Sequence, residues 1–187
     1  MAGGIFGFDA FSPREVAARI ETIGVAKARM PLRTTLMLAV LAGGFIGLGS
    51  IAFLLVASDP ALSFAVSRTL GGAVFSLGLI MVVVAGAELF TGNNLLAMAW
   101  AEGKVGTREL LRNWVLVCLG NLAGAGALAA LVLLADTAAL NGGLIAQKAV
   151  EVAAAKAALA WEVAFFRGAL CNVLVCLAIW MAAAGRS

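Results

Sequence analysis

Four long stretches with almost no charged side chains constrain the fold of this chain more than any other feature of its sequence. They cover residues 34–57, 70–100, 114–135 and 157–184. A helix needs about 20 apolar residues to cross a bilayer. A soluble core built from 187 residues could not bury a composition that is 63% hydrophobic. We therefore expect an all-α membrane protein with about four spans, which form a transmembrane domain over residues 34–187.

Residues 1–33 precede the first stretch and do not resemble a cleavable signal peptide, because no basic start is followed by an apolar run. The segment Ser12–Glu15 is typical of a helix start with proline at its first position. The residues after it form a loose apolar stripe, which consists of Val16, Ile20, Ile23 and Val25. We expect an amphipathic cytoplasmic lead-in that packs on the membrane domain and does not recognise particular lipids.

Basic residues gather on one side of the predicted spans. Five precede the first stretch, three lie between the second and the third, and Arg186 follows the fourth. The loops on the other side hold only Arg68, Lys148 and Lys156. Cytoplasmic loops carry an excess of Lys and Arg, so we expect a multi-pass protein of the cell (inner) membrane with both termini in the cytoplasm. No basic patch interleaved with aromatic residues points to nucleic acid.

The residue types exclude several kinds of catalytic site. The sequence contains no histidine, and its three cysteines, Cys118, Cys171 and Cys176, all fall within predicted spans without Cys-x-x-Cys spacing. Neither a zinc site nor a Ser-His or Cys-His pair can be assembled from this inventory. We therefore expect no metal, no cofactor and no enzymatic activity.

The second stretch is too long for one span and contains poor helix formers at 91–94, the letters TGNN. A helix can break inside a membrane only where its backbone lines a cavity or is buried in protein. We expect two half-helices, the second starting near Asn93 or Asn94 with its N–H groups available to an anion. Glu88 would be protonated or bonded to loop N–H groups, as a clamp on the loop. A loop with only a structural role is the alternative.

Glycine pairs with four-residue spacing recur in two of the stretches. Gly43 and Gly47 lie in the first, and Gly120 and Gly124 lie in the third. Such pairs allow membrane helices to approach closely. They indicate tight packing and say little about transport.

Four segments together carry a family resemblance. They are PLRTTLMLAVLAGGFIGLG at 31–49, GAELFTGNNLL at 86–96, GNLAGA at 120–125 and FFRGALCNVLVCLAIWMAAAGRS at 165–187. They resemble the formate/nitrite transporter family over essentially the whole chain. The resemblance implies a homopentamer of aquaporin-like protomers in the lipid bilayer, with a broken second helix. Each protomer would have a channel-like or proton-coupled pore for small monovalent anions such as formate or nitrite.

The resemblance also implies roles for single residues. Two hydrophobic constrictions would narrow the pore, an outer one formed by Leu89, Phe90 and Val175, and an inner one formed by Phe75 and Leu79. Thr91 would be a polar contact at the central chamber. In the outer vestibule, Lys156 and Asn172 would form a polar pair that draws an anion in. The loop clamp would consist of Glu88, Gly92, Asn93 and Asn94.

Family members continue with two more spans, one of them a broken helix that carries a pore-facing histidine. On this resemblance the chain is incomplete, either as a fragment or as a natural truncation. Two other functions stay open. One is an aquaporin-like channel for neutral solutes, with Asn93 and Asn94 as a hydrogen-bonding filter. The other is a non-transporting remnant or membrane-assembly partner.

Overall fold

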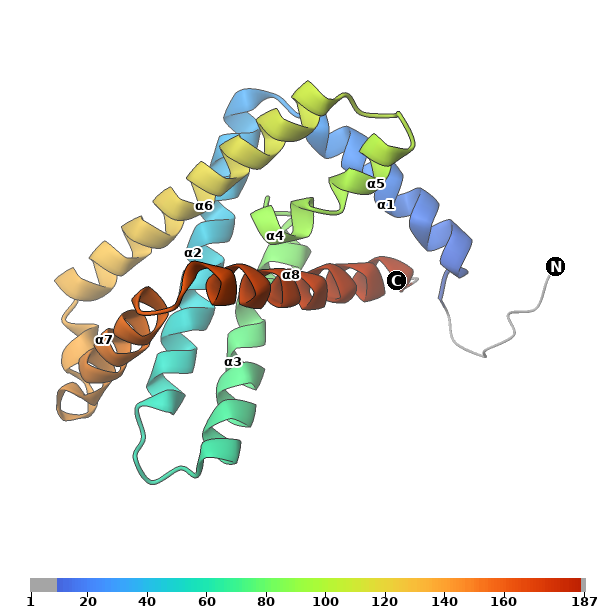
Figure 1. Ribbon diagram of the computed structural model, residues 1–187. Helices are drawn as coiled ribbons and strands as arrows, with labels where there is room; N and C mark the ends of the chain where they lie inside the picture. Colours follow the sequence, from blue (N-terminus) through green and yellow to red (C-terminus); the bar gives the residue numbers. More distant parts are fainter. Residues whose placement is uncertain (1–9, 186–187) are drawn as a thin grey trace.

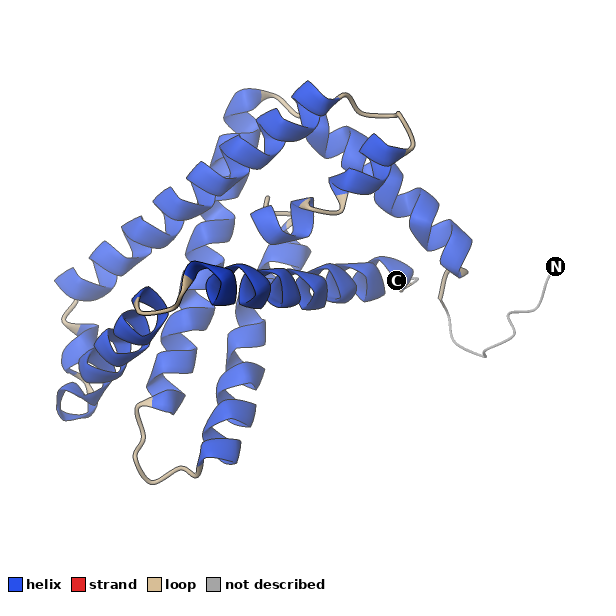
Figure 2. Cartoon of the chain, in the orientation of Figure 1, coloured by secondary structure: helices blue, strands red, loops and turns tan. Residues whose placement is uncertain are grey.

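The computed structural model describes residues 10–185, which are helical apart from loops, turns and one isolated bridge between Ala10 and Gly185 (Figure 2). The start of the predicted lead-in, Arg186 and both chain ends lie outside the described residues. The α-helices are α1 (Pro13–Ala28), α2 (Leu32–Ala57), α3 (Phe64–Ala85), α4 (Phe90–Asn93), α5 (Leu96–Ala101), α6 (Thr107–Leu134), α7 (Leu144–Ala157) and α8 (Trp161–Ala184). Two short 3-10 turns, Thr137–Ala139 and Asn141–Gly143, connect α6 to α7.

Four of these helices, α2, α3, α6 and α8, are long and apolar enough to cross a membrane. The first agrees with its predicted span almost to the residue. The others are shifted: α3 begins six residues before the predicted 70, so Arg68 lies in its first turns and not in a loop. The predicted span 157–184 begins at the end of α7, and α8 itself starts at Trp161 after a short turn.

Helix α2 packs against α3 on one side and α6 on the other, and α6 crosses it closely (Figure 1). A Cβ atom built on Gly124 would lie 1.9 Å from the carbonyl oxygen of Val40, and one on Gly43 would lie 2.1 Å from that of Asn121. Both predicted glycine pairs therefore lie in the α2–α6 contact, where Gly43 and Gly124 meet backbone and Gly47 and Gly120 meet the side chains of Leu128 and Ala39. The prediction of close packing at these glycines is confirmed.

Helix α1 begins as predicted after Ser12, whose backbone N–H and hydroxyl both donate to the Glu15 carboxylate at 2.7 Å. Its buried face is a straight row with four-residue spacing, which consists of Val16, Ile20, Gly24 and Ala28. The predicted stripe was therefore partly wrong, because Ile23 is exposed. The row packs on α5.

Glu21 of α1 also accepts from Lys104 in the loop before α6, and this hydrogen bond raises the pKa of Lys104.

The second span is interrupted over residues 86–95, which we call the break, and the predicted positions 91–94 lie within it. Helix α3 ends where Gly86 adopts a left-handed conformation with φ +63°, which glycine adopts without steric cost. The backbone is non-helical until Leu89, α4 then makes a single turn, and α5 follows with six residues. The predicted half-helix after Asn94 is therefore only a short segment.

The break lies in the half of the helix bundle that is next to α1. The Glu88 N–H donates to the carbonyl of Leu38 at 3.2 Å. Leu38 is six residues into α2, which places it about 9 Å along that helix. Since α2 starts directly after α1, the break is close to the lead-in end of the bundle and far from the α2–α3 loop.

Candidate functional site

A buried polar network joins the break to α1 and α6. Glu88 is 1% exposed, and its carboxylate accepts from the Lys27 ammonium at 2.6 Å and from the Asn93 side-chain amide at 2.7 Å. Lys27 also donates to the Asn93 side chain at 3.1 Å. Asn113 of α6 accepts from the Asn93 amide at 2.9 Å and donates to the Lys27 carbonyl at 3.2 Å. The charges of Lys27 and Glu88 cancel within this network.

This arrangement corrects the predicted environment of Glu88. Its carboxylate is bonded to side chains from α1 and the break, and not to loop N–H groups. The clamp role itself agrees with the geometry, because the carboxylate ties the break to α1. The sequence pattern could not reveal Lys27, which lies 61 residues away and was counted only as a basic lead-in residue.

Asn121 of α6 satisfies the backbone at the start of α4. Its side-chain oxygen accepts from the Phe90 N–H at 2.8 Å, and its amide donates at 2.8 Å to the carbonyls of Glu88 and Ala39. Among residues 10–185, no buried side-chain nitrogen or oxygen lacks a partner. The GNLAGA segment contributes to the family resemblance, but the sequence analysis assigned no role to Asn121. A lone asparagine in an uncharged span was the signal that could have found it.

The two asparagines at the break do not cap α5. Asn93 is engaged in the buried network, and the Asn94 amide donates to the carbonyls of Phe90 and Thr91 within the break. A helix of six residues aligns few peptide dipoles, and the field of a helix end falls off within a turn. The predicted anion site at the N-terminus of a half-helix is therefore not supported.

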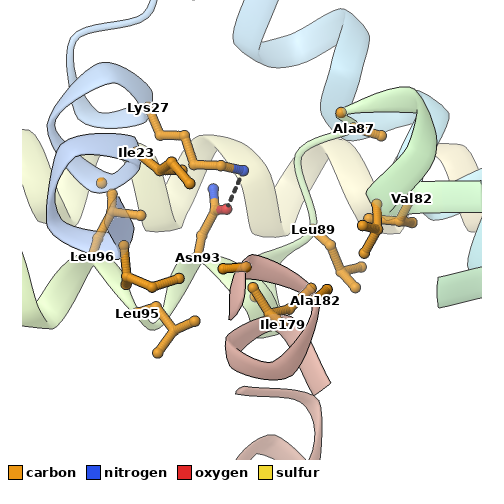
Figure 3. A pocket seen from close by; sticks show the side chains of 16 residues that line it. Ile23, Lys27, Val82, Ala87, Leu89, Asn93, Leu95, Leu96, Ile179 and Ala182 are labelled. Atoms are coloured by element: carbon orange, nitrogen blue, oxygen red, sulfur yellow. Dashed lines mark hydrogen bonds between the residues drawn. The ribbon is translucent and has the colours of Figure 1, made fainter. Parts of the chain in front are cut away.

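A cavity of about 310 Å³, which we call the α1 cavity, lies between α1, the end of α3, the break and α8. Lys27 and Asn93 are polar groups in its wall, and Leu89 and Ile179 contribute apolar surface (Figure 3). Most of its lining is aliphatic. The Phe11 N–H donates to the Ala184 carbonyl at 2.8 Å, which ties the residues just before α1 to the end of α8.

The structure shows where two of the predicted constriction residues pack, and their roles in a pore stay predictions. Leu89 is buried in a cluster with Ala42, Val82 and Ala87, and Leu79 packs against this same cluster. Leu79 therefore belongs with Leu89 and not with Phe75. Leu89 also lines the α1 cavity, because α3 ends close to the start of α2.

The other predicted residues near the break occupy different environments. The Phe90 ring meets the Trp114 ring edge-on, with centroids 6.5 Å apart, and the Trp114 N–H donates to the Asn93 carbonyl at 3.0 Å. The Thr91 carbonyl accepts from the Cys176 thiol at 3.5 Å. Val175 is half-buried one turn before Ile179, on the same face of α8.

A second cavity of about 1160 Å³, which we call the α7 cavity, lies between the α2–α3 loop, α3, α7 and α8. Lys156 and Phe75 both line it. Asn172 instead accepts from the Asn94 amide at 3.2 Å, beside the break. The predicted Lys156–Asn172 pair is therefore not formed, because Lys156 ends α7 and Asn172 lies half-way along α8.

The α7 cavity carries an excess of positive charge. Its basic residues are Arg68, Lys148, Lys156 and Arg167, and its acidic residues are Asp59 and Glu151. Lys148 is paired with Glu151 at 2.9 Å. Sequence reasoning singled out only Lys156 of these cations. The signal for the others was present, because all four lie in or near the segments assigned to the less basic side.

Within residues 10–185, no three Cys, Asp or Glu side chains gather into a group that could hold a metal ion. The two cavities offer charged groups, hydrogen-bonding groups and apolar surface. These are the means by which membrane pores select solutes.

Comparison with known proteins gives consistent matches. The sequence pattern of a family described as "Formate/nitrite transporter" matches residues 14–187. The chain is 32% identical over 179 residues to "Formate channel FocA" of Haemophilus influenzae and 35% identical over 181 residues to "Formate channel FocA" of Escherichia coli (strain K12). These alignments cover 95% and 96% of this chain but 63% and 64% of the relatives, so the chain spans a little under two thirds of their length.

Solved structures show the same likeness. One described as "Pentameric formate channel with formate bound" has a TM-score of 0.78 and 38% identity, and the match covers 83% of this chain and 62% of that one. An "FNT family ion channel" has a TM-score of 0.75 and 32% identity, covering 90% of this chain and 66% of that one. The prediction of an all-α membrane bundle with an interrupted second span is confirmed.

Proposed function

Because this chain belongs to the formate/nitrite transporter family, we propose that the intact protein conducts small monovalent anions such as formate or nitrite across a membrane. The relatives named as formate channels and the formate-bound structural neighbour support this substrate class. The family consists of channels and transporters, which supports a function without catalysis. The multi-pass character follows from the four apolar helices.

The observation that carries the proposal is a hydrophobic seal between the two cavities. Helix α3 lines both of them, with Phe75 in the α7 cavity and Val82 in the α1 cavity. These two residues are seven positions apart, which is about 10 Å along the helix, and Leu79 lies between them against the Leu89 cluster. Two cavities with polar or charged groups, separated by a short hydrophobic seal, form a path that excludes hydrated ions. Such a seal favours a weak acid that sheds its charge by protonation.

The polar network explains how a membrane helix can be interrupted here. An unsatisfied backbone group in hydrocarbon costs several kcal/mol, so an interruption survives only where protein groups pair it. Asn121 supplies such pairing for the Phe90 N–H and the Glu88 carbonyl, and the Asn94 amide does so for the carbonyls of Phe90 and Thr91. In the proposed pore the clamp residues hold Leu89, Phe90 and Thr91 beside the path.

We also propose the assembly and orientation. The homopentamer is supported by the neighbour described as pentameric and by large apolar side chains that remain exposed on α8. We place residues 1–33 in the cytoplasm and residues 34–187 in the inner membrane, because the basic residues cluster on the α1 side. The α7 cavity then opens to the outside, where its positive charge attracts anions.

Uptake by proteoliposomes that contain the intact protein tests this function. We expect saturable uptake of labelled formate and nitrite, and no uptake of glycerol above that of empty liposomes. Glycerol uptake without anion uptake would establish the neutral-solute channel instead. A correctly inserted pentamer that takes up none of the three solutes would favour a non-transporting role.

A further inference from the structure

Arg167 is a charged side chain inside a membrane helix that lies open to the α7 cavity. It is the sixth residue after Trp161 in α8, which places it about 9 Å from the start of that helix. Its side chain is exposed and lines the cavity with Lys156 and Phe75. A cation at this depth is costly against lipid, so such residues face a water-filled cavity or a partner.

The other cations of this cavity have partners. The Arg68 guanidinium lies 5.4 Å from the centroid of the Phe64 ring and 6.0 Å from that of Phe53. Lys148 is paired with Glu151. Within residues 10–185, neither Arg167 nor Lys156 forms an ion pair with an acidic side chain. Among residues 10–185, Lys156 and Arg167 are therefore the cations of this cavity with neither an acidic nor an aromatic partner.

Arginine and lysine recognise anions differently. A guanidinium offers its N–H donors in a planar fork that matches two oxygens of one anion, whereas an ammonium acts as a point charge. Formate and nitrite are both planar with two terminal oxygens, and chloride is spherical. A fork at Arg167 can therefore discriminate between these shapes, and Lys156 can only attract negative charge.

We propose that Arg167 determines anion specificity in the α7 cavity. The paired N–H donors of its guanidinium hold planar two-oxygen anions before these reach Phe75. The proposal deepens the anion-transport function and rests on it. Lys156 attracts anions of any shape, and Arg167 selects among them. Arg167 could otherwise only extend toward the membrane surface to hydrate its charge, and in that role it would have no effect on anion choice.

Formate uptake by proteoliposomes that contain the intact protein tests the proposal, with chloride and nitrite as competitors. We expect Arg167→Met to raise the half-saturating formate concentration about tenfold, the size expected for one charge-assisted contact. Arg167→Lys keeps the charge, so chloride should compete as before while formate and nitrite weaken severalfold. Arg33→Met is the matched control, because Arg33 is an exposed arginine at the opposite end of the bundle, and it should behave as wild type.

Two outcomes would overturn the proposal. One is wild-type half-saturation in Arg167→Met, and the other is an unchanged preference for formate over chloride in Arg167→Lys. If Arg167→Met does not assemble, the Lys variant carries the test, with formate-dependent thermal stabilisation as a second readout. Absence of formate and nitrite uptake in the wild type would instead refute the anion-transport function, so the two failures are distinguishable.

Discussion

Removing Lys27 should destabilise the protein more than neutralising its partner Glu88. The Glu88 carboxylate is 1% exposed and has two side-chain partners, Lys27 at 2.6 Å and Asn93 at 2.7 Å. In Lys27→Met the carboxylate keeps only the neutral amide. Removing one member of a buried ion pair costs about 3–5 kcal/mol, since the remaining charge is buried without compensation.

The reverse change leaves a less costly defect. Glu88→Gln keeps the shape of the side chain and a carbonyl oxygen for the Asn93 amide. The Lys27 side chain is 25% exposed, so water can hydrate its ammonium once the carboxylate is gone. We expect a loss of about 1–2 kcal/mol, the size of one substituted hydrogen bond. The double variant should be more stable than Lys27→Met alone, because it leaves no buried charge.

The midpoint of thermal unfolding of the purified intact protein measures this order. For a protein of this size, 1 kcal/mol shifts the midpoint by about 2–4 °C, so Lys27→Met should lower it by about 10 °C and Glu88→Gln by about 4 °C. Arg29→Met is the control, because both partners of its ion pair with Glu109 are exposed, at 59% and 39%, and the pair should matter little. A larger loss in Glu88→Gln than in Lys27→Met would refute the reasoning, and so would additive losses in the double variant.

The membrane spans could be predicted from the sequence because hydrophobic length is a local property. The same holds for the start of α1, where Ser12 and Pro13 determine the geometry within one turn. Close packing of a helix at Gly43 was also predictable, since a missing side chain allows another helix to approach. Which helices would meet there was not stated, because spacing within one helix does not identify its partner.

The connections of the break depend on residues far away in the sequence. Lys27, Asn113 and Asn121 come from two other helices, and no local pattern links them to Glu88. The end of the helix at Gly86 was also missed. That residue ends α3 through its own backbone conformation, whereas the predicted break was placed at the Gly-Asn-Asn letters.

The resemblance transferred residue roles without their geometry. It placed Phe75 beside Leu79 because the two are one turn apart on α3. Phe75 lines the α7 cavity, whereas Leu79 packs against the Leu89 cluster, so residues one turn apart can have different surroundings. The roles of these side chains in conduction remain predictions.

Two further substitutions test packing and electrostatics. Gly124→Ala should destabilise the protein by about 1–3 kcal/mol, because its Cβ would overlap the Val40 carbonyl. Gly126→Ala is the control and should be neutral, since nothing lies within 4 Å of a Cβ at that site. Equal midpoints of thermal unfolding for the two variants would contradict this. Lys156→Glu should reduce formate uptake most at low ionic strength, because it reverses a positive charge of the α7 cavity that has no acidic partner. The Debye length falls from about 30 Å at 0.01 M salt to about 3 Å at 1 M, so long-range attraction is lost at high salt. At high concentrations of potassium gluconate, formate uptake by the wild type and by Lys156→Glu should therefore become equal. At low salt, uptake by Lys156→Gln should lie between the two. A deficit in Lys156→Glu that is independent of salt would show that this residue acts by contact and not by attracting anions to the cavity.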